Sequence, residues 1–237
     1  MLEGWVRNGD VRIHYLDNTG SSNENIPLVM VPGLAETGED YSDILEALLP
    51  RRVIVITMRG RGQSDTPHHG YTLRDHAEDI SSVINHVDIG KFVLFGYGAG
   101  VIYSLRYAAD HMRQISGIII GDYPAVSLDF QEGWSEFFAK IPGRHGNVLD
   151  RMTMETLKEI EKDSEEVSFL EDLKNMAFPV LILRSSSGKA GLTEEGAKEY
   201  LAAVPDGRIR ILDEDGEEPV AEEFVKTLDD FFQEIER

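Results

Sequence analysis

The chain of 237 residues contains no cysteine. This absence excludes disulfide bonds, thiolate metal sites and a cysteine nucleophile. A chain of this length can bury roughly 70–75% of its unfolded surface, so it needs no cross-links in order to fold. We therefore expect a single domain, residues 1–237, stabilised by its apolar core.

Long apolar runs and positive charge are also scarce. The longest apolar stretches, such as residues 115–120, are far too short to span a bilayer, and residues 1–7 lack the apolar segment of a signal peptide. The 23 basic residues face 43 acidic ones, which gives a net charge of −20. Such a charge repels phosphate backbones and anionic lipid. We therefore expect an acidic, cytoplasmic protein with no nucleic-acid or membrane partner.

The apolar pattern predicts strands that alternate with helices. Residues 5–7 and 11–16 are expected to form a hairpin, and residues 126–177 show helical segments but no convincing strand. Regular alternation favours a mostly parallel sheet with helices on both faces, so we interpret 126–177 as a cap inserted over its carboxyl edge. The further strands are expected at 27–31, 53–57, 91–95, 115–120, 180–183 and 209–212, and the helices at 41–49, 73–87 with Thr72 as N-cap, from the turn 96–100 to about 111, 193–204 and 219–236.

Four stretches follow one another in an order typical of one superfamily. They are Val31-Pro32-Gly33-Leu34, Arg59-Gly60-Arg61-Gly62-Gln63-Ser64-Asp65, Gly96-Tyr97-Gly98-Ala99-Gly100, and the insertion before Phe178-Pro179-Val180. Over essentially its whole length the chain resembles the α/β-hydrolase superfamily, in particular its esterase, haloperoxidase and iminopeptidase-like members. The resemblance implies an α/β-hydrolase fold with a mostly parallel sheet, helices on both faces and a short helical cap.

The same resemblance locates three positions of a catalytic triad. The nucleophilic serine would stand at Gly98, which has no hydroxyl, and the histidine would stand at Glu217. The last histidine of the chain is His145, so a shifted alignment supplies no base. Asp122 follows the sixth strand, where some members carry the acid, but it could equally be a turn aspartate. The pattern predicts a degenerate triad and excludes an ordinary triad esterase.

The backbone part of such a site is expected to survive. The resemblance implies that the Leu34 and Ala99 amides form an oxyanion-hole pair, with Gly33 and Tyr97 beside them, at a helix N-terminus that favours negative charge. We interpret the chain as a non-hydrolytic pseudoenzyme that binds a small carbonyl or anionic ligand in a capped pocket, without a cofactor or metal. An empty, vestigial pocket is the plainer alternative.

Other readings stay open at this point. A hydrolase-class enzyme of this fold could use rearranged residues such as Asp122, Glu217 or His145, or Gly98 could be an engineered replacement of serine. His68 and His69 follow Pro67 in a loop and are expected to be solvated, and a metal site built on both is not expected. Gly96-Tyr97-Gly98 also begins like a dinucleotide-binding G-x-G-x-x-G motif, but Val101 occupies the third glycine position, which argues against it.

Overall fold

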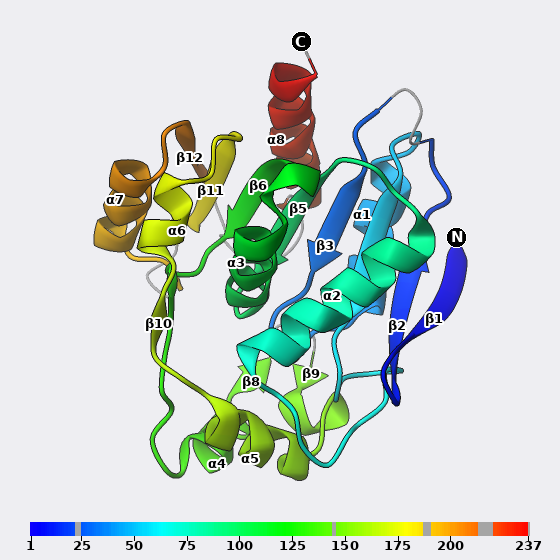
Figure 1. Cartoon of the computed structure of the whole chain (residues 1–237), viewed down its shortest axis with the longest axis vertical. Coiled ribbons are helices and arrows are strands. Elements are labelled where there is room, and N and C mark those ends of the chain that lie inside the picture. Colours follow the sequence, from blue (N-terminus) through cyan, green and yellow to red (C-terminus); the bar gives the residue numbers. More distant parts are fainter. Residues whose placement is uncertain (22–24, 144–145, 187–190, 213–219, 237) are drawn as a thin grey trace.

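A central sheet organises the molecule (Figure 1). The computed structural model describes residues 1–21, 25–143, 146–186, 191–212 and 220–236. Within these ranges eight strands pair in the order β1-β2-β4-β3-β5-β6-β11-β12. The strands are β1 (Leu2–Asn8), β2 (Val11–Asp17), β3 (Leu28–Val31), β4 (Val53–Thr57), β5 (Phe92–Tyr97), β6 (Ile115–Gly121), β11 (Val180–Ser185) and β12 (Gly207–Leu212).

The pairing confirms the predicted mostly parallel sheet. β1 and β2 form the expected antiparallel hairpin, and β2 is also antiparallel to β4. All other neighbours in the sheet are parallel. β1 and β12 are the two edge strands, whereas the central β4 is buried along its whole length.

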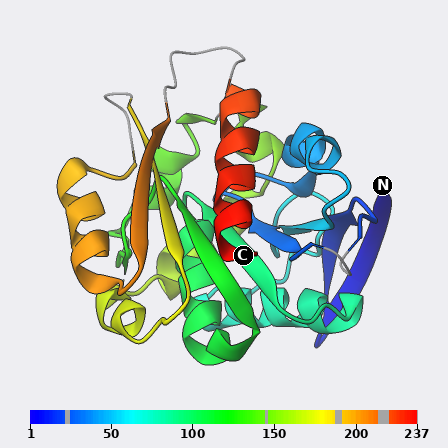
Figure 2. The ribbon, with the colours of Figure 1, turned by 90° about the horizontal axis from the view of Figure 1, so that it is seen from above.

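Helices cover both faces of the sheet, as Figure 2 shows. α1 (Ser42–Ala47) and α8 (Val220–Ile235) lie on one face, where Leu45, Leu228 and Phe232 join one apolar cluster. The opposite face carries α2 (Leu73–Val87), α3 (Gly100–His111), α6 (Leu170–Lys174) and α7 (Glu194–Ala203), which contribute to a second, larger cluster. Burial on both faces explains why interior strands such as β3 and β4 form continuous apolar runs.

α2 illustrates how local sequence sets an element. The Thr72 side chain accepts a hydrogen bond from the Asp75 amide, and the Asp75 carboxylate accepts one from the Thr72 amide. This reciprocal cap satisfies amides that the first helical turn leaves without partners. The helix ends at Asp88, which adopts the left-handed conformation. The predicted bounds of α2 and its N-cap are confirmed.

The segment predicted as a cap contains more strand than expected. α4 (Trp134–Phe138) and α5 (Met154–Asp163) lie beyond the carboxyl ends of the central strands, at the bottom of Figure 1, whereas α6 packs beside α7. The expectation of no strand was wrong, because two-residue strands show no periodicity that a sequence could reveal. The two-residue strands form two antiparallel pairs: β7 (Val126–Ser127) with β10 (Val167–Ser168), and β8 (Pro142–Gly143) with β9 (Gly146–Asn147).

No helix among the described residues is both long enough and apolar enough to cross a bilayer.

Candidate functional site

A cavity of about 470 Å³ lies between the loops that follow β3 and β5 and the segment containing α4 and α5. This volume falls within the range of small-molecule sites. In the cap, Trp134 stacks on Phe130 and on Phe138, with ring centroids 3.9 Å and 5.0 Å apart. The aromatic residues of the cavity wall are Tyr71, Tyr97, Tyr103, Tyr123, Phe130, Trp134 and Phe138.

Gly98 forms part of the cavity wall at the turn between β5 and α3. Its φ of +51° lies in the left-handed region that side chains rarely adopt. A Cβ atom at this position would meet only the Cα of Gly33, at an ordinary 3.6 Å. The turn has the strand-to-helix geometry expected for the nucleophile position, and space is available for a side chain that glycine does not supply.

The residues predicted to bind a ligand meet around Gly98. Gly33, Leu34, Tyr97 and Ala99 all line the same cavity. Among the described residues no acceptor takes the amide hydrogen of Leu34 or of Ala99. Both amides therefore keep a hydrogen available, as the oxyanion-hole interpretation requires.

Asp122 does not line this cavity, and its carboxylate has structural partners. Oδ1 accepts hydrogen bonds from the amides of Ser185 and Leu192, and Oδ2 accepts one from Gly191 at 2.7 Å. Asp122 itself adopts a left-handed φ of +50°. These contacts tie the end of β6 to the segment after β11, which is what a turn aspartate does.

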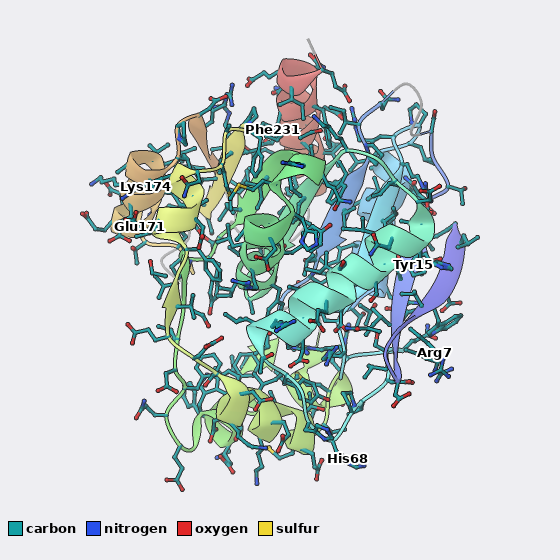
Figure 3. The ribbon with its side chains drawn as sticks, viewed as in Figure 1. Arg7, Tyr15, His68, Glu171, Lys174 and Phe231 are labelled. Carbon is teal, nitrogen blue, oxygen red and sulfur yellow. The ribbon has the colours of Figure 1, made fainter. Side chains whose placement is uncertain are left out.

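The remaining candidate catalytic groups are Glu217, His145, His68 and His69. Glu217 and His145 lie outside the described residues. His68 and His69 are exposed, and neither lines the cavity. Figure 3 shows His68 at the outer edge of the molecule.

Two carboxylates that sequence reasoning missed do line the cavity, Glu36 and Asp163. Oε2 of Glu36 accepts hydrogen bonds from the Gly33 amide at 2.8 Å and from the Tyr41 hydroxyl at 2.6 Å. Asp163, at the end of α5, accepts one from the Tyr71 amide at 2.8 Å. Glu36 lies in the loop after the first motif, but only the fold shows that its side chain reaches the wall. Sequence gave no comparable signal for Asp163.

A family model described as alpha/beta hydrolase fold matches residues 26–201. The chain belongs to the α/β-hydrolase fold family.

Two relatives show what the chain is similar to in sequence. A haloalkane dehalogenase from Psychrobacter cryohalolentis is 27% identical over 186 residues, covering 73% of this chain and 61% of the relative. A Bacillus subtilis protein named only as an AB hydrolase superfamily member is 37% identical over 169 residues, covering 65% of this chain and 59% of the relative. The chain thus spans less than two thirds of the length of these relatives.

Solved structures show the same fold over the whole chain. A thermophilic esterase from Thermogutta terrifontis, solved with malate bound, superposes with a TM-score of 0.82 and covers 100% of both chains at 17% identity. At that identity the likeness concerns the α/β-hydrolase fold alone.

Behind the cavity wall of this α/β hydrolase, Arg61 and His76 form a buried polar network. His76 is fully buried and stacks on Tyr103 with 3.9 Å between ring centroids. Its Nδ1 lies 2.8 Å from the Thr72 carbonyl and its Nε2 lies 3.0 Å from Nη1 of Arg61. Burial, reinforced by the charge of Arg61, holds the pKa of His76 well below its usual range. A neutral imidazole satisfies both contacts by donating through Nδ1 and accepting at Nε2.

Arg61 also holds the loop that carries the Leu34 amide. Its Nε donates to the Leu34 carbonyl at 2.9 Å, and its Nη2 donates to the Tyr103 hydroxyl at 3.3 Å. The Arg-Gly-Arg motif therefore has a structural role at the site that its resemblance to the family did not reveal.

One group of metal-ligating atoms occurs among the described residues, away from the cavity wall. Ligand atoms of Glu3, His14 and Glu39 lie within 4.8 Å of one another. The Gln63 amide donates to both carboxylates, at 2.7 Å and 3.0 Å, and His14 Nε2 lies 3.1 Å from Glu3. These hydrogen bonds account for the arrangement without a cation.

Proposed function

We propose that this α/β-hydrolase-fold chain binds a small, uncharged carbonyl compound and does not hydrolyse it. The observation that carries the proposal is Gly98, which faces an apolar cavity beside two available amides but has no nucleophilic atom. The amides of Leu34 and Ala99 would hold the carbonyl oxygen, and the aromatic wall would hold the apolar remainder.

Magnitudes favour binding over turnover. In a serine protease, removing either the serine or the histidine lowers turnover by about a million-fold. The oxyanion hole and binding alone leave roughly 10³–10⁴-fold acceleration over water. An oxyanion-type pair without a nucleophile and base is thus mainly a recognition element.

Charge on the cavity wall favours an uncharged ligand over an anion. Glu36 and Asp163 are part of the wall, and Arg151, the cationic side chain among the described wall residues, is paired with Asp40 at 2.6 Å. Like unit charges about 4 Å apart repel by roughly 4 kcal/mol near a protein surface. Glu36, whose carboxylate accepts a hydrogen bond from the Gly33 amide, would therefore repel an anion held in this part of the cavity.

The test compares binding with hydrolysis on the same protein. We expect p-nitrophenyl butyrate to be hydrolysed no faster than by a surface-residue background, while a matched ketone shifts the NMR signals of the Leu34 and Ala99 amides. Acetate at equal concentration should shift them less. Turnover near 1 s⁻¹ that a serine-directed phosphonate abolishes would overturn the proposal.

A variant at Ala99 tests the amide directly. Its φ of −60° matches that of proline, so Ala99→Pro removes the amide hydrogen without changing φ at this position. We expect ketone binding to weaken about tenfold or more in Ala99→Pro and to persist in Ala99→Ser, which keeps the amide. Equal binding by both variants would show that the pair is not the binding element.

The second candidate function is a hydrolase-class reaction with rearranged residues, and Glu36 is the observation that favours it. Its carboxylate lies beside Gly33. Gly33 in turn is the residue that a side chain at position 98 would contact. A water held there could be activated by Glu36. Any ester hydrolysis above background that Glu36→Gln abolishes, while Asp163→Asn retains it, would support this alternative.

A further inference from the structure

We propose that the Tyr103 hydroxyl is a second anchor in the cavity and selects ligands that carry another acceptor oxygen besides the carbonyl held by the amides. The inference rests on the proposed binding function and names its ligand class: uncharged dicarbonyl compounds such as β-keto esters.

The first observation is a buried cation that has no counterion among the described residues. Arg61 is only 1% exposed. Its guanidinium contacts the carbonyls of Leu34 and Arg59, the Tyr103 hydroxyl and the His76 ring, all of which are neutral groups. Across the described part of the chain no carboxylate lies within ion-pair distance of Arg61. Buried charges are normally paired, so this one strongly polarises the groups that it touches.

The second observation is an uncommitted hydroxyl hydrogen. Tyr103 accepts a hydrogen bond from Arg61, and no acceptor in the described ranges receives the hydrogen of its own hydroxyl. Tyr103 is part of the cavity wall. A phenol whose oxygen accepts from a cation is a stronger donor, because each hydrogen bond in a chain polarises the next.

The third observation fixes the ring. Tyr103 stacks on His76 with an interplanar angle of 5°, and both ring nitrogens of His76 are engaged, by Thr72 and Arg61. The donor is therefore held in place before a ligand arrives, which lowers the entropic cost of binding.

The Tyr103 hydroxyl lies on the same helix, α3, as one of the two amides, that of Ala99. Ala99 and Tyr103 are four residues apart at the start of the same helix, so they lie on one face. Both line one cavity. A single ligand can thus engage the amides with its first carbonyl and Tyr103 with its second.

The experiment uses two probes of the same shape. Ethyl benzoylacetate carries a ketone oxygen that ethyl 3-phenylpropanoate lacks. NMR titration of the Leu34 and Ala99 amides in the full chain gives a dissociation constant for each. One neutral hydrogen bond corresponds to about a 3- to 10-fold preference for the keto ester.

Three variants locate the origin of that preference. Tyr103→Phe keeps the stacked ring and should reduce the preference to about one, and Arg61→Met should lower it because the hydroxyl loses its polarising partner. Tyr107→Phe is the matched control on the same helix, since Tyr107 does not line the cavity and its hydroxyl already donates to the Gln114 side chain at 2.7 Å. We expect the control to keep the wild-type preference.

The outcomes separate this inference from the proposed function. Binding of both esters with equal affinity, or an unchanged preference in Tyr103→Phe, overturns the role of Tyr103 and leaves the binding function standing. Enzymatic hydrolysis of either ester overturns the binding function instead, and binding of neither overturns both. If Tyr103→Phe does not fold, the wild-type preference and the Arg61→Met result still decide.

Discussion

Gly96, Gly98 and Gly100 line one turn, but the reason for glycine at position 98 differs from the reason at the other two positions. A Cβ atom on Gly96 would lie 2.6 Å from the Gly100 carbonyl oxygen, and one on Gly100 would collide with the carbonyls of Val31 and Pro32. Gly98 meets no such obstacle, and only its left-handed φ favours glycine. Packing therefore requires the outer two glycines, whereas the middle one is free to vary.

Gly98→Ser should consequently fold. We expect the free energy of unfolding to fall by about 1–2 kcal/mol, which is the usual cost of a side chain in the left-handed region. Urea denaturation measures it, and Gly96→Ser, which packing forbids, is the comparison that should fail to fold or lose far more. A Gly98→Ser variant as unstable as Gly96→Ser would contradict the assigned turn geometry.

The catalytic consequence of the same substitution is separate. Gly98→Ser alone should not become an esterase, because serine is a poor nucleophile until a base takes its proton. Gly98→Ser combined with Glu217→His should give weak hydrolysis of p-nitrophenyl esters. If the single variant is as active as the double one, a base other than residue 217 operates, and the choice of position 217 from sequence is wrong.

At the scale of single elements, α2 is a helix that buries two polar residues. His76 and Asp79 are both fully buried, yet they belong to a helix whose opposite face is solvated. Arg59 pairs with Asp79 through two hydrogen bonds of 2.6 Å and 2.7 Å, and Asn8 donates to the same carboxylate at 2.8 Å. These contacts join α2 to the loop after β4 and to the hairpin.

Removal of Asp79 should therefore be costly. Asp79→Ala leaves Arg59 buried with only the more distant Asp75, at 3.5 Å, and breaking a buried pair in this way typically costs about 3–5 kcal/mol. The control lies one position away on the same helix. Glu78 pairs with Arg74 at the surface, so Glu78→Ala should change the unfolding free energy by less than about 0.5 kcal/mol. Similar losses for the two variants would argue against the buried pair.

His76 should make stability depend on pH in a defined direction. It stays neutral in the folded protein because its pKa is lowered, whereas in the unfolded chain it is protonated below about pH 6.5. The unfolded state then binds the additional proton, so the unfolding free energy should fall as pH drops below 6.5, by at most about 1.4 kcal/mol per pH unit. Denaturation between pH 7.5 and 5.5 measures this slope, which His76→Gln should reduce and His69→Gln should preserve.

The sheet and its main helices could be predicted from sequence because their signals are local. Apolar runs mark β4 and β6, and Thr72 with Asp75 marks the start of α2. The loops around Gly33 and Gly98 were located by motif and resemblance. Glu36 and Asp163 could not be predicted as wall residues, because side-chain direction in a loop and the docking of α5 depend on contacts distant in sequence.

At the scale of the whole molecule, the net charge differs in sign from the charge of the polar network beside the cavity. The chain carries −20, yet the buried polar network behind the cavity wall centres on an arginine and a neutral histidine, Arg61 and His76. Surface charge is screened within about 8–10 Å at physiological salt, while contacts inside the cavity are not. Ligand choice should therefore follow the few groups in and behind the wall rather than the overall charge.

The edge strands of the sheet affect whether molecules of this protein aggregate at high concentration. An open edge strand is a template on which another chain can add, and charged side chains are a common defence. β12 pairs only with β11 in the described part of the chain, and it carries Arg208 and Arg210, two of the few cations of an acidic protein. Arg208 forms ion pairs with Asp206 and Glu234. Arg210 is exposed, so its charge is the one that opposes the addition of another strand to β12. Strand addition at this edge thus depends on residues that do not line the cavity, and a hydrophobic residue at position 210 would favour edge-to-edge aggregation.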